Sequence, residues 1–359
     1  MAICNLIRRI VYFAIGLSTV FLVAGLLTMH TIAETFQFEN GIEVKKLFTV
    51  GVDGENVADD DPYFFYDIYK VECDSKGNLY IFDFKAHCVK VFDKNGKFIK
   101  KLFRSGEGPN EISNVYGMGI NKFTDHIYML QDYGYTLKEF DRHGKYVKLH
   151  MNPQQFFSML EFIDKDRCIY RAFNNTNQPS WYLFKVLNVE TDKIEKEFAA
   201  TTEEETHSHY QRFTLIDNIL WTAPGDKMEL RAYDFKTGNK IKRIDIPGDY
   251  KKNIYKVKKI PGGEMRRPIY YNSAQPFKIN GRLFLLVLLQ EYRKENDSVE
   301  DFPFKSTHFL YILEGDTVKK LGVLEGCDFM FLDTVWENRF ILQADDPYPR
   351  VTVFELTVK

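Results

Sequence analysis

The sequence of 359 residues lacks most of the short motifs that carry known chemistry. Its five cysteines form no CxxC pair, which argues against a zinc site held by thiolates. There is no G-x-S-x-G nucleophile elbow and no H-E-x-x-H motif, so enzyme activity has no positive support. No long amphipathic helix pattern occurs either. These absences favour an all-β protein without a catalytic centre.

An excess of charge of either sign is also missing. The 48 basic and 50 acidic residues give a formal net charge of −2. A nucleic-acid-binding domain is expected to be strongly basic, and no RNA-recognition or helix-turn-helix pattern is present. Apolar residues make up 45% of the chain and aromatic residues 15%, enough to bury a sizeable core. We therefore expect no nucleic-acid partner.

What the sequence does contain is a run of turn signals between short apolar segments. Lys76-Gly77-Asn78 tolerates the positive φ of a tight turn and precedes the aromatic and β-branched run 79–82. Asn95-Gly96, a strong hairpin signal, separates the strands expected near 89–91 and 98–99. The segment 74–112 thus predicts three consecutive antiparallel strands, as in one blade of a propeller.

The same pattern recurs downstream, as it must, because a single blade cannot bury its own faces. Gly144 takes the place of Gly96 in the second copy, and weaker copies follow. We predict an all-β, six-bladed β-propeller of four-stranded antiparallel blades over residues 34–359. The expected blades are 66–104, 115–150, 157–199, 211–247, 274–323 and 327–359. The early strand 43–50 would pair with the last blade and close the ring, which removes exposed edges.

Two alternatives stay open for the architecture. A seventh blade is the main one, because the long link from Pro247 to Asn272 could conceal a strand pair. An ordinary β-sandwich or a pair of barrels is the other. Residues 153–160 are expected to be at most a short helical or irregular insertion.

The link Ser105-Gly106-Glu107-Gly108-Pro109-Asn110-Glu111 resembles the "GxGPxEF" link of NHL-repeat propellers. Through it, the chain resembles the exported six-bladed β-propellers of NHL or TolB-like type. That resemblance does not fix a function. Some similar propellers are calcium-dependent lactonases or amidating lyases, whose carboxylate and amide ligands come from several blades. No such set can be matched here, so a metal-dependent lactonase or hydrolase is only the second hypothesis.

The N-terminus predicts export. Arg8-Arg9 precedes an uncharged stretch from Ile10 to Ala33, and Thr31-Ile32-Ala33 offers a small-residue cleavage site. We expect residues 1–33 to be a signal peptide, which places the protein in the periplasm or cell envelope. An uncleaved signal anchor is the alternative, since the stretch is long enough to span a bilayer. Cleavage would remove two arginines and no acidic residue, so the mature charge would be −4.

Four cysteines remain after cleavage, namely Cys73, Cys88, Cys168 and Cys327. The blade assignment puts Cys73 and Cys88 on the first and third strands of one blade, which are not neighbours. We therefore expect buried free thiols, with a Cys73–Cys88 disulfide as the alternative.

No cofactor is expected, although two acidic segments contain possible metal ligands. Calcium is possible at the run 53–61, but this run lacks EF-hand spacing. His207 and His209 follow three glutamates and could form a shallow divalent-metal patch. Solvated surface loops are the better interpretation of both segments.

The segment 250–271 is the most unusual, with seven basic residues, one acidic residue and four tyrosines. We expect a loop between blades four and five that binds anionic groups through arginine and stacks on ligands through tyrosine. A long solvated loop is the competing interpretation. The link 104–111 could project polar groups near the channel mouth, and its competing interpretation is a tight crossing that its glycines permit. The candidate ligand-binding residues are Arg104, Glu107, Asn110, Glu111, Tyr255, Arg266, Arg267, Tyr270 and Tyr271.

These observations predict a non-catalytic, monomeric, exported propeller that binds through its channel face and the segment 250–271. The expected partner is a cell-envelope protein, a glycan, a peptide or an anionic small molecule. A structural module that docks a partner protein is a third hypothesis. Contact with a membrane is expected only through an uncleaved N-terminal anchor.

Overall fold

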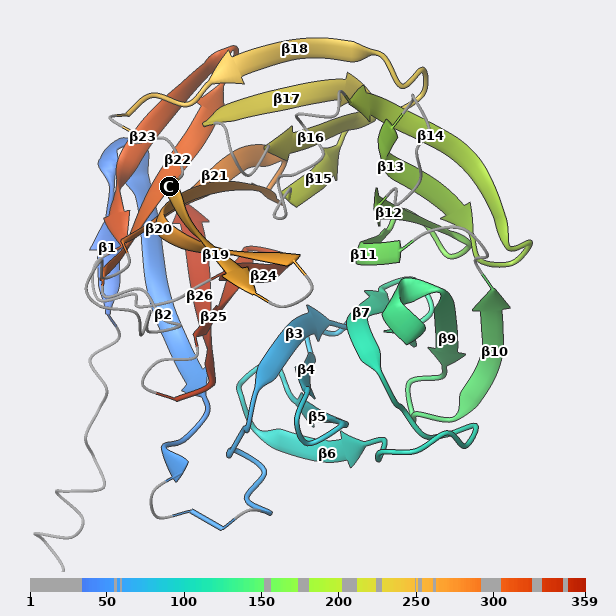
Figure 1. Ribbon diagram of the computed structural model, residues 1–359. Helices are drawn as coiled ribbons and strands as arrows, with labels where there is room; N and C mark the ends of the chain where they lie inside the picture. The colour runs from blue at the N-terminus through green and yellow to red at the C-terminus, as the bar shows by residue number, and fades with distance from the viewer. Residues whose placement is uncertain are drawn as a thin grey trace, which may run out of the picture.

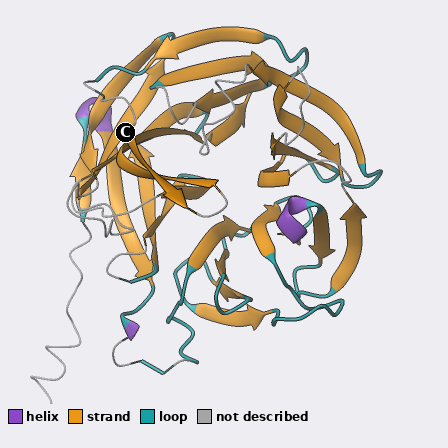
Figure 2. Cartoon of the chain, viewed as in Figure 1, coloured by secondary structure: helices purple, strands orange, loops and turns teal. Residues whose placement is uncertain are grey.

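The computed structural model describes residues 34–54, 57–58, 60–151, 156–173, 181–201, 212–223, 228–248, 250, 254–260, 263–291, 305–324, 331–344 and 348–359. Six antiparallel sheets surround a central axis, as Figure 1 shows. Almost every ordered element is a strand (Figure 2), and helical geometry in the named elements of these ranges is limited to the single 3₁₀ turns η1 (Glu39–Gly41) and η3 (Asp132–Gly134). The chain is a six-bladed β-propeller, as the turn pattern predicted.

The first four blades are four-stranded meanders in which each strand pairs with the next. Blade one consists of β3 (Ile68–Cys73), β4 (Leu79–Asp83), β5 (Cys88–Phe92) and β6 (Phe98–Leu102). Blade two consists of β7 (Val115–Asn121), β8 (His126–Gln131), β9 (Thr136–Phe140) and β10 (Tyr146–Met151). Blade three consists of β11 (Phe156–Phe162), β12 (Arg167–Phe173), β13 (Trp181–Asn188) and β14 (Lys193–Thr201). Blade four consists of β15 (Arg212–Ile216), β16 (Ile219–Ala223), β17 (Glu229–Asp234) and β18 (Lys240–Asp245).

The last two blades have five strands each. Blade five consists of β19 (Ile254–Ile260), β20 (Gly263–Ile279), β21 (Arg282–Glu291), β22 (Lys305–Glu314) and β23 (Thr317–Leu324). Blade six has the order β1 (Thr35–Gln37), β2 (Ile42–Val50), β26 (Arg350–Val358), β25 (Arg339–Ala344) and β24 (Phe331–Trp336). The N-terminal strand β2 pairs with β26 from Ile42↔Val358 to Val50↔Val351, so the predicted closure is confirmed.

The turns predicted in blades one and two are present and have a common cause. Asp93 Oδ1 accepts hydrogen bonds from the backbone N–H groups of Asn95 and Lys97, both at 2.9 Å. Asp141 Oδ1 does the same for His143 and Lys145, at 2.8 and 2.9 Å. Gly96, at φ 83°, takes the left-handed conformation that glycine adopts without a steric penalty. The aspartate side chain thus replaces a backbone acceptor and fixes each hairpin.

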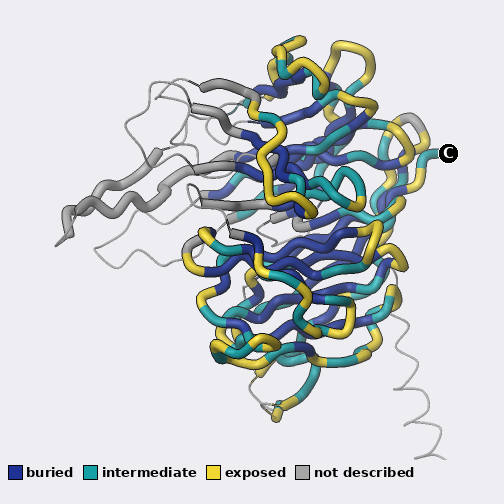
Figure 3. Tube along the Cα trace, turned by 90° about the vertical axis from the view of Figure 1, so that its right-hand side faces the viewer, coloured by how far each residue is buried: buried dark blue, intermediate teal, exposed yellow. Residues whose placement is uncertain are grey.

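The core lies between the blades rather than within them. Each of six buried apolar clusters joins two neighbouring blades; for example, Phe82 and Val91 of blade one contact Met129 and Phe140 of blade two. Figure 3 shows the buried segments stacked through the interior, with exposed residues mainly at the turns. Because every blade face is covered by its neighbour, the ring must close before either end blade is buried.

A regularly placed lysine also connects successive blades. Lys100, Lys148 and Lys196 lie on the outer strands β6, β10 and β14 and are spaced 48 residues apart. The ammonium groups donate to carbonyls in the outer turn of the following blade: Arg142 at 2.8 Å, Val189 at 3.1 Å and Phe235 at 2.8 Å. This spacing is a sequence repeat that the turn signals alone did not reveal.

Two sequence-based expectations were wrong. The described residues 254–260 and 263–271 form strands rather than a loop: β19 pairs with the first part of β20, from Ile254↔Tyr270 to Ile260↔Gly263. The link does conceal a strand pair, but that pair extends blade five instead of forming a seventh blade. Residues 156–162 are the innermost strand of blade three, not an irregular insertion. In both segments β-branched and aromatic residues pair with a neighbouring strand, and this pairing outweighs the local charge or the nearby proline.

Candidate functional site

The link 104–111 forms a compact structure of its own. Arg104 Nε donates to Glu111 Oε1 at 2.8 Å, and the backbone N–H of Gly108 donates to Glu111 Oε2 at 2.9 Å. Asn110 Oδ1 accepts from the backbone N–H of Tyr146 at 2.8 Å. These bonds hold the link against blade two. The N–H of Gly108 and the Arg104 side chain lower the pKa of the Glu111 carboxyl.

The same link borders an open depression of about 660 Å³ between the outer parts of blades one and two. Its wall combines Arg104, Asn110 and Glu111 with His143 and Lys145 from the outer turn of blade two. The structure therefore brings three predicted site residues together, but at a place separate from the channel cavity described next. Glu107 is not among the residues that line the depression.

The other predicted site residues lie on the β19–β20 hairpin. Tyr255, Arg266 and Arg267 belong to its paired region, and Tyr270 and Tyr271 begin the stretch in which β20 also pairs with β21. The orientation of these side chains lies outside what the structure describes. At about 3.3 Å per residue, the 17 residues of β20 place the hairpin turn about 50 Å along the strand from Lys278. The hairpin and the channel cavity are therefore at opposite ends of one strand.

A cavity of about 350 Å³ lies in the central channel. All six innermost strands, β3, β7, β11, β15, β20 and β24, contribute to its wall, mostly with residues in their C-terminal halves or directly after them. Figure 1 shows these strands around the central axis. Its size is at the lower end of the range for small-molecule pockets. Its charged residues are Lys70, Glu72, Lys122, Glu161, Lys278 and Glu337, and its aromatic residues are Phe123, Phe162, Phe213 and Phe277.

Some of the charges in this cavity compensate one another. Lys70 Nζ lies 3.1 Å from Glu72 Oε1, and the two side chains are only 13% and 11% exposed. Lys278 Nζ lies 3.7 Å from Asp217 Oδ1 nearer the surface. Lys122 Nζ instead donates to the carbonyl oxygen of Val335 at 2.9 Å, which joins blade two to blade six.

Glu161 is the carboxyl group with the most unusual environment. It lies on β11 and accepts a hydrogen bond from the backbone N–H of Leu215 on β15. Burial raises the pKa of the Glu161 carboxyl to about 7. Lys122 acts against this rise, Glu72 adds to it, and the Leu215 N–H and Lys70 act against it more weakly. A carboxyl group that changes protonation near neutral pH inside a cavity marks a candidate functional site.

Phe123 marks the mouth of the cavity. Its side chain is 60% exposed, the highest value among the large apolar residues in the described ranges. Phe213 and Phe277, by contrast, are 8% and 2% exposed. The cavity thus has an apolar interior, an exposed aromatic rim and charged groups from several blades, a combination that suits a small amphipathic ligand.

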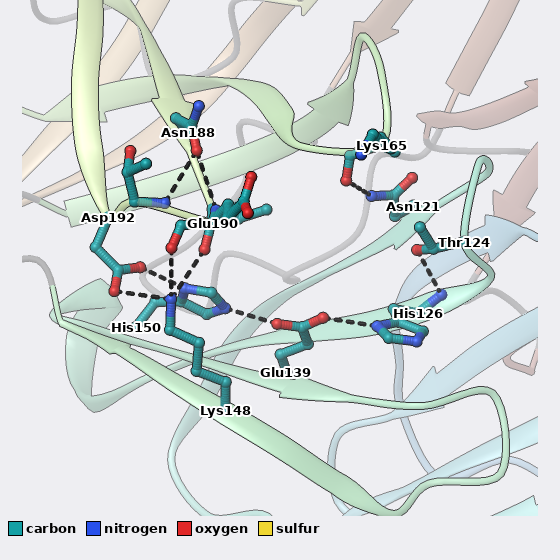
Figure 4. A network of polar contacts seen from close by, with 12 residues as sticks. Asn121, Thr124, His126, Glu139, Lys148, His150, Lys165, Asn188, Glu190 and Asp192 are labelled. Atoms are coloured by element: carbon teal, nitrogen blue, oxygen red, sulfur yellow. Dashed lines mark hydrogen bonds and ion pairs between the residues drawn. The ribbon is translucent and has the colours of Figure 1, made fainter.

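A second polar network lies between blades two and three and is structural in character (Figure 4). Glu139 accepts from His126 Nδ1 at 2.6 Å and from His150 Nε2 at 2.9 Å, and His150 Nδ1 lies 2.5 Å from Asp192 Oδ1. His150 is 2% exposed and Glu139 is 8% exposed. The ligand-sized cavity is elsewhere, so this network joins the two blades rather than forming a pocket.

Neither metal nor thiol chemistry has a clear place in the described part of the chain. No group of three or more histidine, cysteine, aspartate or glutamate residues there could hold a metal ion. The His207–His209 patch lies outside it. Cys73, Cys88 and Cys168 are buried free thiols, as expected, while Cys327 lies outside the described residues. Burial raises the pKa of the Cys73 and Cys168 thiols to about 12, so both stay protonated.

The predicted leader, residues 1–33, also lies outside the described residues. Among those that are described, no helix is both long enough and apolar enough to cross a bilayer.

Fold and cavity together define a six-bladed β-propeller with a ligand-sized site on its axis. Residues 60–246 match the DUF5128 family, described as a 6-bladed beta-propeller, and the chain belongs to that family. No curated protein matches the sequence.

Two solved structures from Bacteroides have a similar fold. One is a member of the DUF4221 family from Bacteroides vulgatus, with a TM-score of 0.61 and 12% identity over 89% of this chain and 99% of that one. The other is a candidate exported protein from Bacteroides fragilis, with a TM-score of 0.57 and 10% identity over 91% of this chain and 98% of that one. At such low identity the similarity shows the fold alone.

Sequence analysis missed the channel residues. Glu72, Lys122 and Glu161 lie on or directly after inner strands and belong to three different blades, far apart in sequence. One signal was available: each is a charged residue at, or directly after, the C-terminal end of a mainly apolar inner strand. That signal becomes specific only when the blades are placed around an axis.

Proposed function

We propose that this protein is an exported, non-catalytic propeller that binds a small ligand in its channel cavity. The observation that carries the proposal is Glu161, a partly buried carboxyl group on the wall of a 350 Å³ cavity that all six blades build. The cavity suits a metabolite-sized molecule better than a folded partner. Rigid inner strands hold its walls, so little ordering would oppose binding.

Export is part of this proposal. It rests on the basic and apolar leader with its small-residue cleavage site, and the candidate exported protein from Bacteroides fragilis with the same fold supports it. The same leader supports a periplasmic or cell-envelope location. The link 105–111 supports assignment to the NHL or TolB-like type of propeller.

The depression at 104–111 and the β19–β20 hairpin are two further candidate surfaces for a larger partner. The depression is open and carries Arg104, His143 and Lys145, which suits an anionic peptide, glycan or envelope protein. The hairpin and the cavity are at opposite ends of β20, and the depression shares no lining residue with the cavity, so we treat both surfaces as separate from the channel site.

The channel proposal is tested by ligand-observed NMR on the purified protein. The probe is a fragment set of aromatic amines, aromatic carboxylic acids, aromatic amino acids and neutral aromatic amides. Thr214→Trp should fill the cavity, since Thr214 lines it on β15. Ile241→Trp adds the same side chain on the outer strand β18, where Ile241 is 49% exposed, and serves as the matched control.

We expect at least one fragment class to bind the wild type and the Ile241→Trp variant but not the Thr214→Trp variant. Circular dichroism should show both variants folded. Absence of binding by every class, or equal binding by both variants, would contradict the channel site.

A further inference from the structure

Two opposite charges in the channel cavity are left without an ionic partner. Glu161 and Lys122 come from blades three and two, and within the described ranges neither has an oppositely charged group within 4 Å. In the described part of the chain both side chains hydrogen-bond to backbone: the Leu215 N–H donates to Glu161, and Lys122 donates to the Val335 carbonyl. Lys122 is the strongest charge acting on Glu161, so the two groups are close enough to interact.

Most of the remaining charges of the cavity are already compensated. Lys70 is paired with Glu72 at 3.1 Å, and Lys278 with Asp217 at 3.7 Å. Glu337 is exposed in the turn after β24, where water solvates its charge. A ligand with one positive charge would meet Glu161 but would be repelled by Lys122. A ligand with one negative charge would meet Lys122 but would leave the partly buried Glu161 without a cationic partner, which is costly.

The apolar part of the cavity limits the size and the chemical type of the uncharged part of the ligand. Phe162, Phe213 and Phe277 line the inner wall, and Phe123 stands exposed at the mouth. Phenylalanine faces pack well against aromatic groups and attract a nearby ammonium group. A volume of about 350 Å³ holds a compact molecule with one ring more readily than a long peptide.

We propose that the channel cavity selects a small aromatic zwitterion, with its ammonium group against Glu161, its carboxylate toward Lys122 and its ring among the phenylalanines. This inference rests on the proposed channel function and names the class of ligand. Lys122 is exposed, whereas Glu161 lies between β11 and β15, so the ammonium end enters first.

Binding of the zwitterion should release a proton from Glu161. Burial keeps a large fraction of Glu161 protonated at pH 6, because its pKa is about 7. An incoming ammonium group favours the ionised form, so the proton leaves Glu161 for the buffer as the ion pair forms. Affinity for the zwitterion should then rise between pH 5.5 and pH 7.5, by up to about tenfold per pH unit below pH 7.

Isothermal titration calorimetry with three matched probes tests the proposed ligand class and the proton release. L-phenylalanine carries both charges, phenethylamine only the positive one and 3-phenylpropionate only the negative one. We expect L-phenylalanine to bind at least tenfold more tightly than either analogue. At pH 6 its binding should release protons, seen as a dependence of the measured heat on the ionisation enthalpy of the buffer.

Three variants separate the two contacts. Glu161→Gln keeps the side-chain shape and should weaken the binding of L-phenylalanine and phenethylamine about tenfold. It should leave the affinity for 3-phenylpropionate unchanged or higher, and it should abolish proton release. Lys122→Gln should weaken the binding of L-phenylalanine and of 3-phenylpropionate. Lys165→Gln, at a side chain that is 72% exposed, is the control and should bind like the wild type.

The possible failures are distinct. If a singly charged analogue binds as tightly as L-phenylalanine, or if none of the three probes binds, the zwitterion inference is wrong. If the Thr214→Trp variant no longer binds the probes that bind the wild type, the channel is still the binding site, and only the proposed ligand class is wrong. If binding survives in Thr214→Trp, both proposals fall.

Discussion

His150 and Glu139 are joined in the interior by a hydrogen bond of 2.9 Å between Nε2 and Oε2. The other ring nitrogen of His150 lies 2.5 Å from Asp192 Oδ1 (Figure 4). The His150 ring thus bridges two carboxylates, Glu139 of blade two and Asp192 of blade three. These contacts connect β9, β10 and the outer turn of blade three.

Glu139→Gln should destabilise the protein by about 2–4 kcal/mol at pH 7, because it leaves buried His150 with one carboxylate fewer. Burial alone would raise the pKa of Glu139, but hydrogen bonds from His150, His126 and Tyr128 lower it to about 2. A carboxyl with a lowered pKa stabilises the fold above its unfolded pKa of about 4.3, and this contribution disappears as the pH falls toward 2. Urea unfolding at several pH values measures the difference.

The difference between wild type and Glu139→Gln should therefore shrink between pH 5 and pH 2. Glu190→Gln is the control, because only the backbone carbonyl of Glu190 contacts Lys148. A difference that stays constant over this range would show that Glu139 contributes by packing alone.

Glu161→Gln should have the opposite effect on stability: it should stabilise the protein at high pH. The folded pKa of about 7 lies above the unfolded value, so ionising Glu161 costs stability as the pH rises from about 4.5 through 7. We expect the variant to be more stable than the wild type by about 1–2 kcal/mol at pH 8, allowing for the partial exposure of this side chain. Near pH 4 the two proteins should be equal. Lower stability of the variant at pH 8 would assign Glu161 a structural role.

Gly96→Ala should destabilise the contact between blades six and one. Gly96 has φ 83°, and a Cβ there would lie 2.7 Å from the ring of Phe48 on β2. Backbone strain and steric overlap together predict a loss of about 1–3 kcal/mol and a lower melting temperature. Gly315→Ala is a matched control, since its φ is 60° but a Cβ there meets nothing within 4 Å. Equal losses would show that strain alone acts.

Removal of divalent metal should leave the melting temperature unchanged. No metal ligand set is found in the described part of the chain, and a bound ion stabilises a fold by mass action only where it has a site. Differential scanning calorimetry with EDTA and then with added calcium makes the measurement. A clear rise with calcium would place a site in the residues that the structure does not describe, and it would favour the metal-dependent lactonase hypothesis.

Local signals were enough for much of the fold. Asp93 with Gly96 and Asp141 with Gly144 close hairpins through contacts only two to four residues apart, so their effect is visible in the sequence. The alternation of apolar strands and turns, repeated along the chain, required blades that cover one another. The 48-residue spacing of Lys100, Lys148 and Lys196 would have strengthened this prediction.

The segment 250–271 shows where local reasoning failed. Its basic residues and tyrosines indicated a ligand-binding loop, but β20 continues from the hairpin into the centre of blade five without a break. Pairing with β19 and β21 satisfies its backbone hydrogen bonds, and this gain does not depend on the charge of the side chains. The same strand carries the hairpin at one end and Lys278 of the channel cavity at the other.

The sequence by itself determined the strands, their turns, the repeat and the closing role of residues 43–50, because these depend on neighbours within one blade or on apolar faces that must be covered. Only the tertiary structure decided the site. Lys122 and Glu161 are 39 residues apart and belong to different blades, and they line one cavity because closing the ring brings every inner strand to one axis. There, burial and the surrounding charges give Glu161 a protonation behaviour that no local pattern encodes.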